Sequence, residues 1–168
     1  MQRSSHVIPL LIALLISACA TQPKQSLDTT VPQGLTATDV ELAVLLATGL
    51  IPPESTGYKN WDEYVKGCLR NAGRLVISGP DLQEEDHWIF EMADRSSVQA
   101  SYTDGAESLE AKIEYSATKV RISMLNSRNL DESGDRIDPR ANDWLADLRL
   151  RINRGLGRVQ FLKHHFSG

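Results

Sequence analysis

The chain has 168 residues, with 18 basic and 22 acidic side chains and a formal net charge of −4. This mild acidity argues against nucleic-acid binding, which depends on clustered basic residues. A chain of this length has room for one ordinary hydrophobic core, and therefore for one domain once any targeting segment is removed.

The first residues have the form of a secretory signal. Arg3 places a positive charge near the start, and an apolar run follows from Val7 to Ile16. That run is shorter than the roughly 20 apolar residues that a membrane-spanning helix needs. Small residues then precede a cysteine, as they do at a signal cleavage site. We therefore expect residues 1–18 to be a signal peptide.

Residues Ile16-Ser17-Ala18-Cys19 resemble the lipobox of bacterial lipoproteins. The resemblance implies a diacylglyceryl thioether on Cys19, cleavage after Ala18, and a further acyl chain, such as palmitate, on the new amino group. Two or more acyl chains hold a protein stably on a membrane. Ala20 stands where an aspartate resembles the inner-membrane retention signal of enteric bacteria, so we expect the outer membrane, facing the periplasm. The alternatives are an ordinary signal with an incidental cysteine, or a core helix.

Charge is distributed unevenly along the chain. Removal of residues 1–18 takes away one charge, that of Arg3, and changes the net charge from −4 to −5. Residues 81–110 hold nine acids and one base, whereas residues 148–168 hold five bases and no acid: Arg149, Arg151, Arg154, Arg158 and Lys163. The basic stretch is either a solvated helix face, with cations favoured near a helix C-terminus, or a contact for acidic headgroups or an acidic partner.

The tether and the first helix are predicted from the next segment. Residues 20–36 are polar and contain two prolines and one glycine, which is typical of a flexible tether. We expect residues 19–36 to be the lipidated cysteine and this tether, and residues 37–168 to form a single domain. Thr38-Asp39-Val40-Glu41 has the form of a capping box. The apolar run after it predicts a short buried helix that ends at Gly49.

A second helix is predicted after Asn60. The apolar residues recur at helical spacing: Trp61, Tyr64, Val65, Cys68 and Leu69. With Cys19 lipidated, Cys68 is alone in an oxidising compartment, which suggests either intermolecular pairing or a buried thiol. Its place on the apolar face favours an inert core thiol.

The middle of the chain changes to a period of two. Residues 75–77 predict a short strand, and four alternating runs separated by turn residues follow: Trp88–Met92, Val98–Tyr102, Leu109–Tyr115 and Val120–Met124. Alternating runs with short turns predict an antiparallel meander with one covered face.

A last helix is predicted from Asp138-Pro139, because aspartate suits the cap and proline the first helical position. Its apolar stripe consists of Trp144, Leu145, Leu148 and Ile152, and we expect Gly155 and Gly157 to end it. The predicted class is therefore α+β, with an antiparallel four-stranded meander packed against two or three helices.

The segments HWIFE, SVQASY, AKIEYSATKVRISMLNSRNL and GDRIDPRANDWLADLRLRI lie within residues 87–152. This stretch resembles a family of small uncharacterised lipoproteins of Gram-negative bacteria, in which two strands end in an S-x-N-L turn before a loop and a helix with one tryptophan. The family has histidine where this chain has Asp138. The resemblance implies an α+β lipoprotein domain and no activity.

The motifs of common enzymes do not occur: there is no G-x-S-x-G, P-loop or H-E-x-x-H. His164 and His165 point apart on a helix, which makes a weak metal site. The loop from Asp131 to Asp138 resembles a calcium loop only loosely, because its twelfth position is Asn142 rather than a glutamate. Nothing fixes a catalytic geometry for residues 84–86, an acidic run. We expect no catalytic residue, no metal site and no cofactor.

Four polar residues crowd the end of the last predicted strand: Asn126, Ser127, Arg128 and Asn129. Asparagine and serine bond their own backbone in turns, but loops on a rigid scaffold also carry function, and Arg128 offers a fork for a carboxylate or phosphate. We hypothesise a non-enzymatic interaction or adaptor module, bound to the membrane through Cys19 and to an envelope protein. The alternatives are a small-ligand (lipid or glycan) binder, with a pocket lined by Trp61, Trp88 and Trp144, or an envelope hydrolase.

Overall fold

The structure is a computed structural model that describes residues 22–51, 57–70, 72 and 88–166. The predicted signal peptide with Cys19, the predicted strand at 75–77 and the acidic run at 84–86 lie outside these residues. Along the chain the elements are β1 (Gln22–Pro23), β2 (Ser26–Thr30), α1 (Ala37–Ala47), α2 (Trp61–Arg70), β3 (Trp88–Asp94), β4 (Ser97–Asp104), β5 (Glu107–Tyr115), β6 (Lys119–Arg128), β7 (Glu132–Ser133), β8 (Arg136–Ile137) and α3 (Pro139–Phe166).

The predicted α+β class and the antiparallel meander are confirmed. Strands β3 to β6 pair consecutively in an antiparallel sheet of order β2-β6-β5-β4-β3. Alternate side chains point to one face and are fully buried, among them Val98, Ala100, Ile113 and Ile122. The other face carries the intervening residues, which are mostly polar, with exposed Ile89 on β3 as an exception, as expected for a sheet covered on one side.

The sheet has a fifth strand that the sequence analysis missed. Residues 26–30, within the expected tether of residues 19–36, form β2 and pair with β6, with Leu27 opposite Ile122. Residues 22–23 form β1, which pairs with β8 in a small second sheet of order β1-β8-β7. The prediction of a flexible tether is therefore wrong for these strands. Within β2 Leu27 is the single buried residue, so this edge strand lacks the alternating apolar pattern of the others.

The first helix begins two residues earlier than predicted. Its N-cap is Thr36 rather than Thr38, and the partner in the capping box is Asp39 rather than Glu41. Thr36 Oγ1 accepts from the backbone of Asp39 at 3.2 Å, and the Asp39 carboxylate accepts from the backbone of Thr36 at 2.7 Å. Helix α2 begins after Asn60 as predicted, and Asn60 caps it, because Asn60 Oδ1 accepts from the backbone of Glu63 at 3.0 Å.

Helix α3 starts as predicted, with Asp138 Oδ1 accepting from the backbone of Arg140 at 2.9 Å. Its predicted end at Gly155 and Gly157 is wrong: the helix continues to Phe166 and has 28 residues, about 42 Å at 1.5 Å per residue. Gly155 is a point of close approach between helices. A Cβ there would lie 2.5 Å from the carbonyl oxygen of Ala43 in α1.

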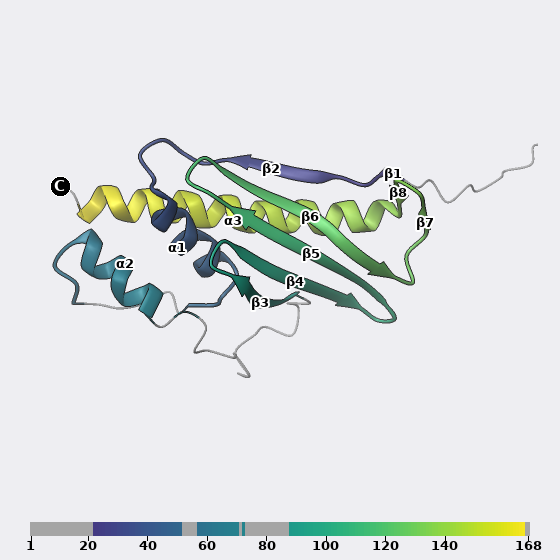
Figure 1. Cartoon of the computed structure of the whole chain (residues 1–168), viewed down its shortest axis with the longest axis horizontal. Helices are drawn as coiled ribbons and strands as arrows, with labels where there is room; N and C mark the ends of the chain where they lie inside the picture. The colour runs from purple at the N-terminus through teal and green to yellow at the C-terminus, as the bar shows by residue number, and fades with distance from the viewer. Residues whose placement is uncertain (1–21, 52–56, 71, 73–87, 167–168) are drawn as a thin grey trace, which may run out of the picture.

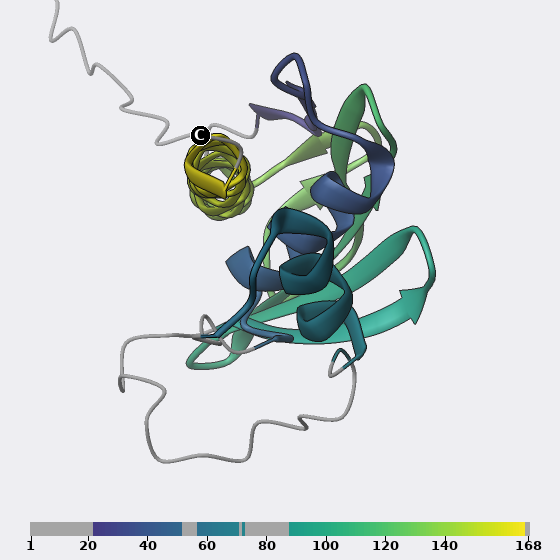
Figure 2. The same ribbon diagram turned by 90° about the vertical axis from the view of Figure 1, so that its left-hand side faces the viewer.

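Helices α1 and α3 pack on one side of the five-stranded sheet. Figure 1 shows α3 running along the length of the sheet and α2 beyond the ends of the strands, next to α1; Figure 2 shows α3 from its end, beside the sheet. The buried residues of α3 form the inner stripe, which includes Leu145, Leu148, Ile152 and Val159. Among the described helices, none is long and apolar enough to span a membrane.

The two helical glycines of α3 provide a matched pair of variants. We expect Gly155→Ala to lower the free energy of unfolding by about 1–3 kcal/mol, because the added methyl group overpacks the crossing with α1. Gly157→Ala has nothing within 4 Å of its Cβ, so it should stabilise the helix by up to about 1 kcal/mol. Urea denaturation measures both values. Equal stability of the two variants would contradict a close crossing at Gly155.

Candidate functional site

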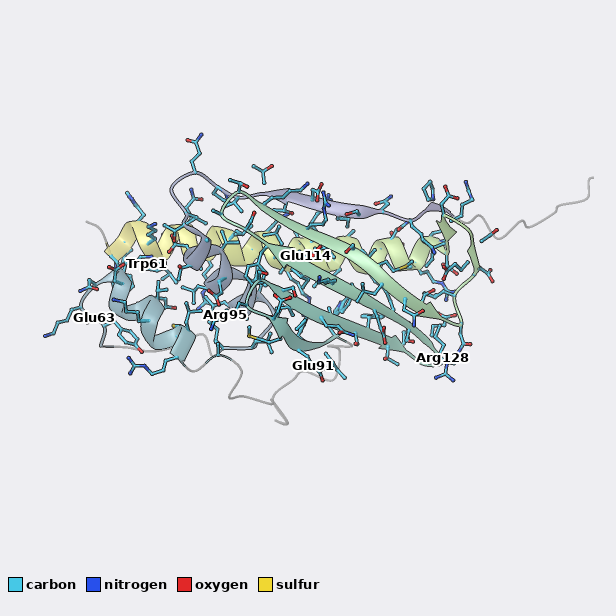
Figure 3. All side chains as sticks on the ribbon, in the orientation of Figure 1. Trp61, Glu63, Glu91, Arg95, Glu114 and Arg128 are labelled. Carbon is cyan, nitrogen blue, oxygen red and sulfur yellow. The ribbon has the colours of Figure 1, made fainter. Side chains whose placement is uncertain are left out.

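The four residues proposed as an interaction patch lie at the end of β6, far from Trp61 at the other end of the molecule (Figure 3). Asn126 Oδ1 accepts from the backbone of Ser127 at 2.9 Å, and Ser127 Oγ donates to Glu132 at 2.8 Å. Asn129 has a φ of 57°, and its side-chain amide donates to the carbonyl of Ala106. These three side chains hold the local turn.

Arg128 is the member of the patch that remains available for a partner. Its side chain is exposed, and among the described residues it forms no ion pair. Its backbone is fixed, because Arg128 stands opposite Ser108 in the sheet. The candidate patch therefore reduces to a guanidinium on a rigid strand end, a group suited to binding a carboxylate or phosphate.

The loop that loosely resembles a calcium site is a β-hairpin made of β7 and β8. Two of its four carboxylates have partners within the protein: Glu132 pairs with Lys24, and Asp138 pairs with Arg140 at 2.7 Å. Within the described segments there is no group of three or more histidine, cysteine, aspartate or glutamate side chains that could hold a metal ion. His164 and His165 lie exposed in the last turn of α3.

Within the described residues the three tryptophans fall into two groups: Trp61 packs against Tyr64, whereas Trp88 and Trp144 both pack against Tyr102. Trp61 and Trp88 are buried, and Trp144 is half-buried, with its ring centroid 4.4 Å from that of Tyr102. A surface hollow of about 590 Å³ lies elsewhere, between the segment before α1 and the C-terminal part of α3. Its lining residues are Gln33, Gly34, Leu35, Gly157, Gln160, Phe161, Lys163 and His164.

A buried carboxylate, missed by the sequence analysis, lies at the junction of the three helices. Asp39 has 2% of its surface exposed. Besides its bonds with Thr36, it accepts from Trp61 Nε1 at 2.7 Å and from Lys163 Nζ at 2.8 Å. Lys163 Nζ also donates to the carbonyl of Gly34 at 2.7 Å. The start of α1, the start of α2 and the end of α3 are thus joined through one side chain.

The electrostatic balance at Asp39 favours the charged form. Burial raises its pKa, but hydrogen bonds from Lys163, the Thr36 backbone, Trp61 and the Thr36 hydroxyl outweigh burial and hold the pKa below the ordinary value of 3.8. Both carboxylate oxygens are already occupied by donors of the protein. The Asp39 carboxylate therefore suits a structural role, holding the three helices together, better than proton exchange with a substrate.

Cys68 lies in the core, as its spacing predicted. Only 4% of the Cys68 surface is exposed, and its side chain lies next to that of Tyr64, one turn earlier in α2. Burial, together with the adjacent thiol of Cys68, raises the pKa of Tyr64 to about 12. Since the thiolate is the reactive form of cysteine and a reagent must reach it, this environment is that of a packing residue.

No protein-family model, curated protein or solved structure matches the chain. The similarity of residues 87–152 to small Gram-negative lipoproteins therefore stays a prediction.

Removal of one partner from the Asp39–Lys163 pair is expected to have unequal effects. Lys163→Met leaves a carboxylate buried without its cation and should lower the free energy of unfolding by about 3 kcal/mol. Asp39→Asn should cost about 1–2 kcal/mol, because the Lys163 side chain is 28% exposed and can be hydrated. The exposed pair Lys112–Glu114 is the control: Lys112→Met should cost well under about 1 kcal/mol.

The same pair sets a pH dependence. The pKa of Asp39 is lower in the folded than in the unfolded chain, so its contribution is fully present above the unfolded value near 3.8. It is lost as the pH falls through the folded pKa. The difference in stability between the wild type and Asp39→Asn should therefore shrink below about pH 4 in urea denaturation curves. A constant difference from pH 7 to pH 3 would contradict the charged state.

The burial of Cys68 is testable with a thiol reagent. In a Cys19→Ser chain, where Cys68 is the remaining cysteine, we expect an aromatic disulfide reagent to react slowly with the folded protein and rapidly in denaturant. The comparison of the two absorbance time courses gives the protection of the thiol. Similar rates in both conditions would place Cys68 at an accessible surface.

Proposed function

We propose that this protein is a lipoprotein of the bacterial envelope, anchored through Cys19 to the outer membrane and facing the periplasm, whose α+β domain is a non-enzymatic interaction module for an envelope protein. The signal and lipobox pattern of residues 1–19 supports the anchor. The observation that carries the interaction role is the outer face of the five-stranded sheet, which the helices leave uncovered (Figure 2).

The outer face of the sheet carries charged side chains that are held in place by ion pairs. Asp28 on β2 pairs with Arg121 on β6 at 3.1 Å and with Lys119 at 2.5 Å. On β5, Lys112 pairs with Glu114 at 2.9 Å. Charges fixed on a rigid sheet supply the complementarity that selects a partner and its orientation. Exposed Arg128 lies at the end of β6 and extends this surface.

The N-terminal strands support a short connection to the anchor. β1 begins at Gln22, three residues after Cys19, a span of at most about 11 Å in a fully extended chain. The carbonyl of Pro23 accepts from Asn142 of α3 at 3.1 Å, and the backbone of Lys24 donates to that of Asp135 at 2.7 Å. A lipid on Cys19 would therefore hold this end of the domain close to the membrane.

A second candidate is the binding of a small ligand, such as a lipid or glycan. The observation in its favour is the hollow of about 590 Å³ beside Phe161, which falls in the size range of ligand sites. It is the weaker candidate because the hollow is open to solvent on the side of Phe161, a lining residue that is 70% exposed. Ligand sites usually enclose most of the ligand surface.

The proposal is tested by photo-crosslinking in living cells. A crosslinking amino acid replaces Gln99 on the outer face of the sheet, Arg128 at its end, or, as a control, exposed Asp62 on α2. We expect Gln99 or Arg128, but not Asp62, to give one discrete adduct with an envelope protein. Palmitate labelling of the same cells should mark the wild type and not Cys19→Ser.

The two readouts separate the two parts of the proposal. Absence of palmitate from the wild type would remove the anchor. Adducts of equal pattern at all three positions, or none at Gln99 and Arg128, would remove the sheet as the interaction surface.

A further inference from the structure

We propose that the outward side of the C-terminal half of α3 binds a membrane surface rich in anionic phospholipid. The lipid binding itself depends only on residues of α3. The statement that this is the membrane carrying the anchor rests on the proposed function. The residues concerned, here called the α3 outer stripe, are Leu150, Arg154, Arg158, Phe161 and His165.

The α3 outer stripe is a continuous feature of the helix surface. Its members follow one another at intervals of three or four residues, which places them on one side of an α-helix. All five are exposed, and they lie opposite the buried residues Leu148, Ile152 and Val159. Figure 2 shows α3 end-on at the margin of the domain, with the sheet on its other side.

Among the described residues, no ion pair neutralises the arginines of the stripe. Arg151, at the margin of the stripe, pairs with Asp147 at 3.2 Å, but beyond Asp147 the sequence has no acidic residue. Within the part of the chain that the structure describes, Arg154 and Arg158 form no ion pair. Two guanidinium groups one helical turn apart therefore present an uncompensated positive charge to the surroundings.

Exposed apolar side chains accompany these bases. Phe161 is 70% exposed and Leu150 is 46% exposed. The ring of Phe161 stacks on that of His165, with centroids 6.4 Å apart and planes at 5°. A helix with basic residues and an aromatic ring on one side is typical of contact with the membrane interface, where the ring enters the headgroup region and the bases meet anionic lipid.

The position of the stripe matches an anchor at the start of α3. Asn142 in the first turn of α3 bonds to Pro23, four residues after Cys19. From Leu150 to His165 the stripe extends about 22 Å along the helix at 1.5 Å per residue. An anchor at one end of α3 and a basic stripe along the rest would let the helix lie on the membrane. The anchor then supplies a high effective concentration, so that a weak lipid contact suffices.

An acidic protein surface is the competing occupant, since it would satisfy the same arginines. The membrane is favoured because Phe161 and Leu150 lie beside those arginines and because the hollow next to Phe161, about 590 Å³ in volume, gives room for part of a lipid. The proposed lipid on Cys19 would also bring the stripe close to a membrane, whereas binding to a protein partner would not require that lipid.

The test is vesicle co-sedimentation of the unlipidated chain from residue 19, with Cys19→Ser. Vesicles contain phosphatidylethanolamine with about a third phosphatidylglycerol, or phosphatidylcholine alone. We expect binding to the anionic vesicles that weakens with salt, and little binding to the neutral ones. The double variant Arg154→Glu/Arg158→Glu should lower the partition coefficient for the anionic vesicles at least about tenfold, because the loss of each base weakens binding to an anionic surface several-fold. Phe161→Ser should reduce it several-fold.

The control variant is Lys66→Glu/Arg70→Glu on α2, a pair of exposed bases with the same spacing and the same change of charge. It should bind like the parent chain, and thermal denaturation by circular dichroism verifies that all variants fold. Equal losses in the two double variants, or no binding by the parent chain, overturn the proposal. Binding of poly-glutamate by a parent chain that does not bind vesicles would also overturn the proposal, in favour of an acidic protein partner. None of these outcomes depends on whether Cys19 is lipidated in cells.

Discussion

The Asp39 carboxylate is the interaction on which the arrangement of the helices depends. A charge removed from water must be paired and hydrogen-bonded, and the donors come from Thr36 at the start of α1, Trp61 at the start of α2 and Lys163 near the end of α3. Their positions are therefore mutually fixed. Helix α3 reaches Lys163 only because it continues through Gly155 and Gly157, and the lack of a side chain at Gly155 lets α1 approach it.

The parts of the fold that were predictable are those encoded by local pattern. The meander, α2 and the start of α3 each show their period or cap in consecutive residues. The cap of α1 does not, because both Thr36 and Thr38 have an acidic residue three positions later. The choice of Asp39 as the partner is set by Trp61 and Lys163, 22 and 124 residues away. Contacts with residues so far away along the chain cannot be recognised in a local sequence motif.

The candidate sites show the same limit. At the end of β6 the polar residues looked alike in sequence, and the roles of Ser127 and Asn129 depend on Glu132 and on the carbonyl of Ala106. In α3 the run of bases was visible, but the expected end at the glycines would have separated Phe161 from Arg154. Continuation of the helix places both on one side, so the apolar component of this surface follows from the structure and not from composition.

The two uncovered surfaces of the domain differ in electrostatics and lie on opposite sides. On the outer face of the sheet the cations of Lys119, Arg121 and Lys112 form ion pairs with Asp28 and Glu114, so this face carries a fixed pattern of charges of both signs. On the α3 outer stripe the charge is of one sign. A surface of one sign suits a partner that is itself uniform in charge, such as a lipid surface, whereas a patterned face suits a partner with a pattern of its own. A domain lying on α3 would turn its sheet away from the membrane, which leaves the patterned face open to a periplasmic partner.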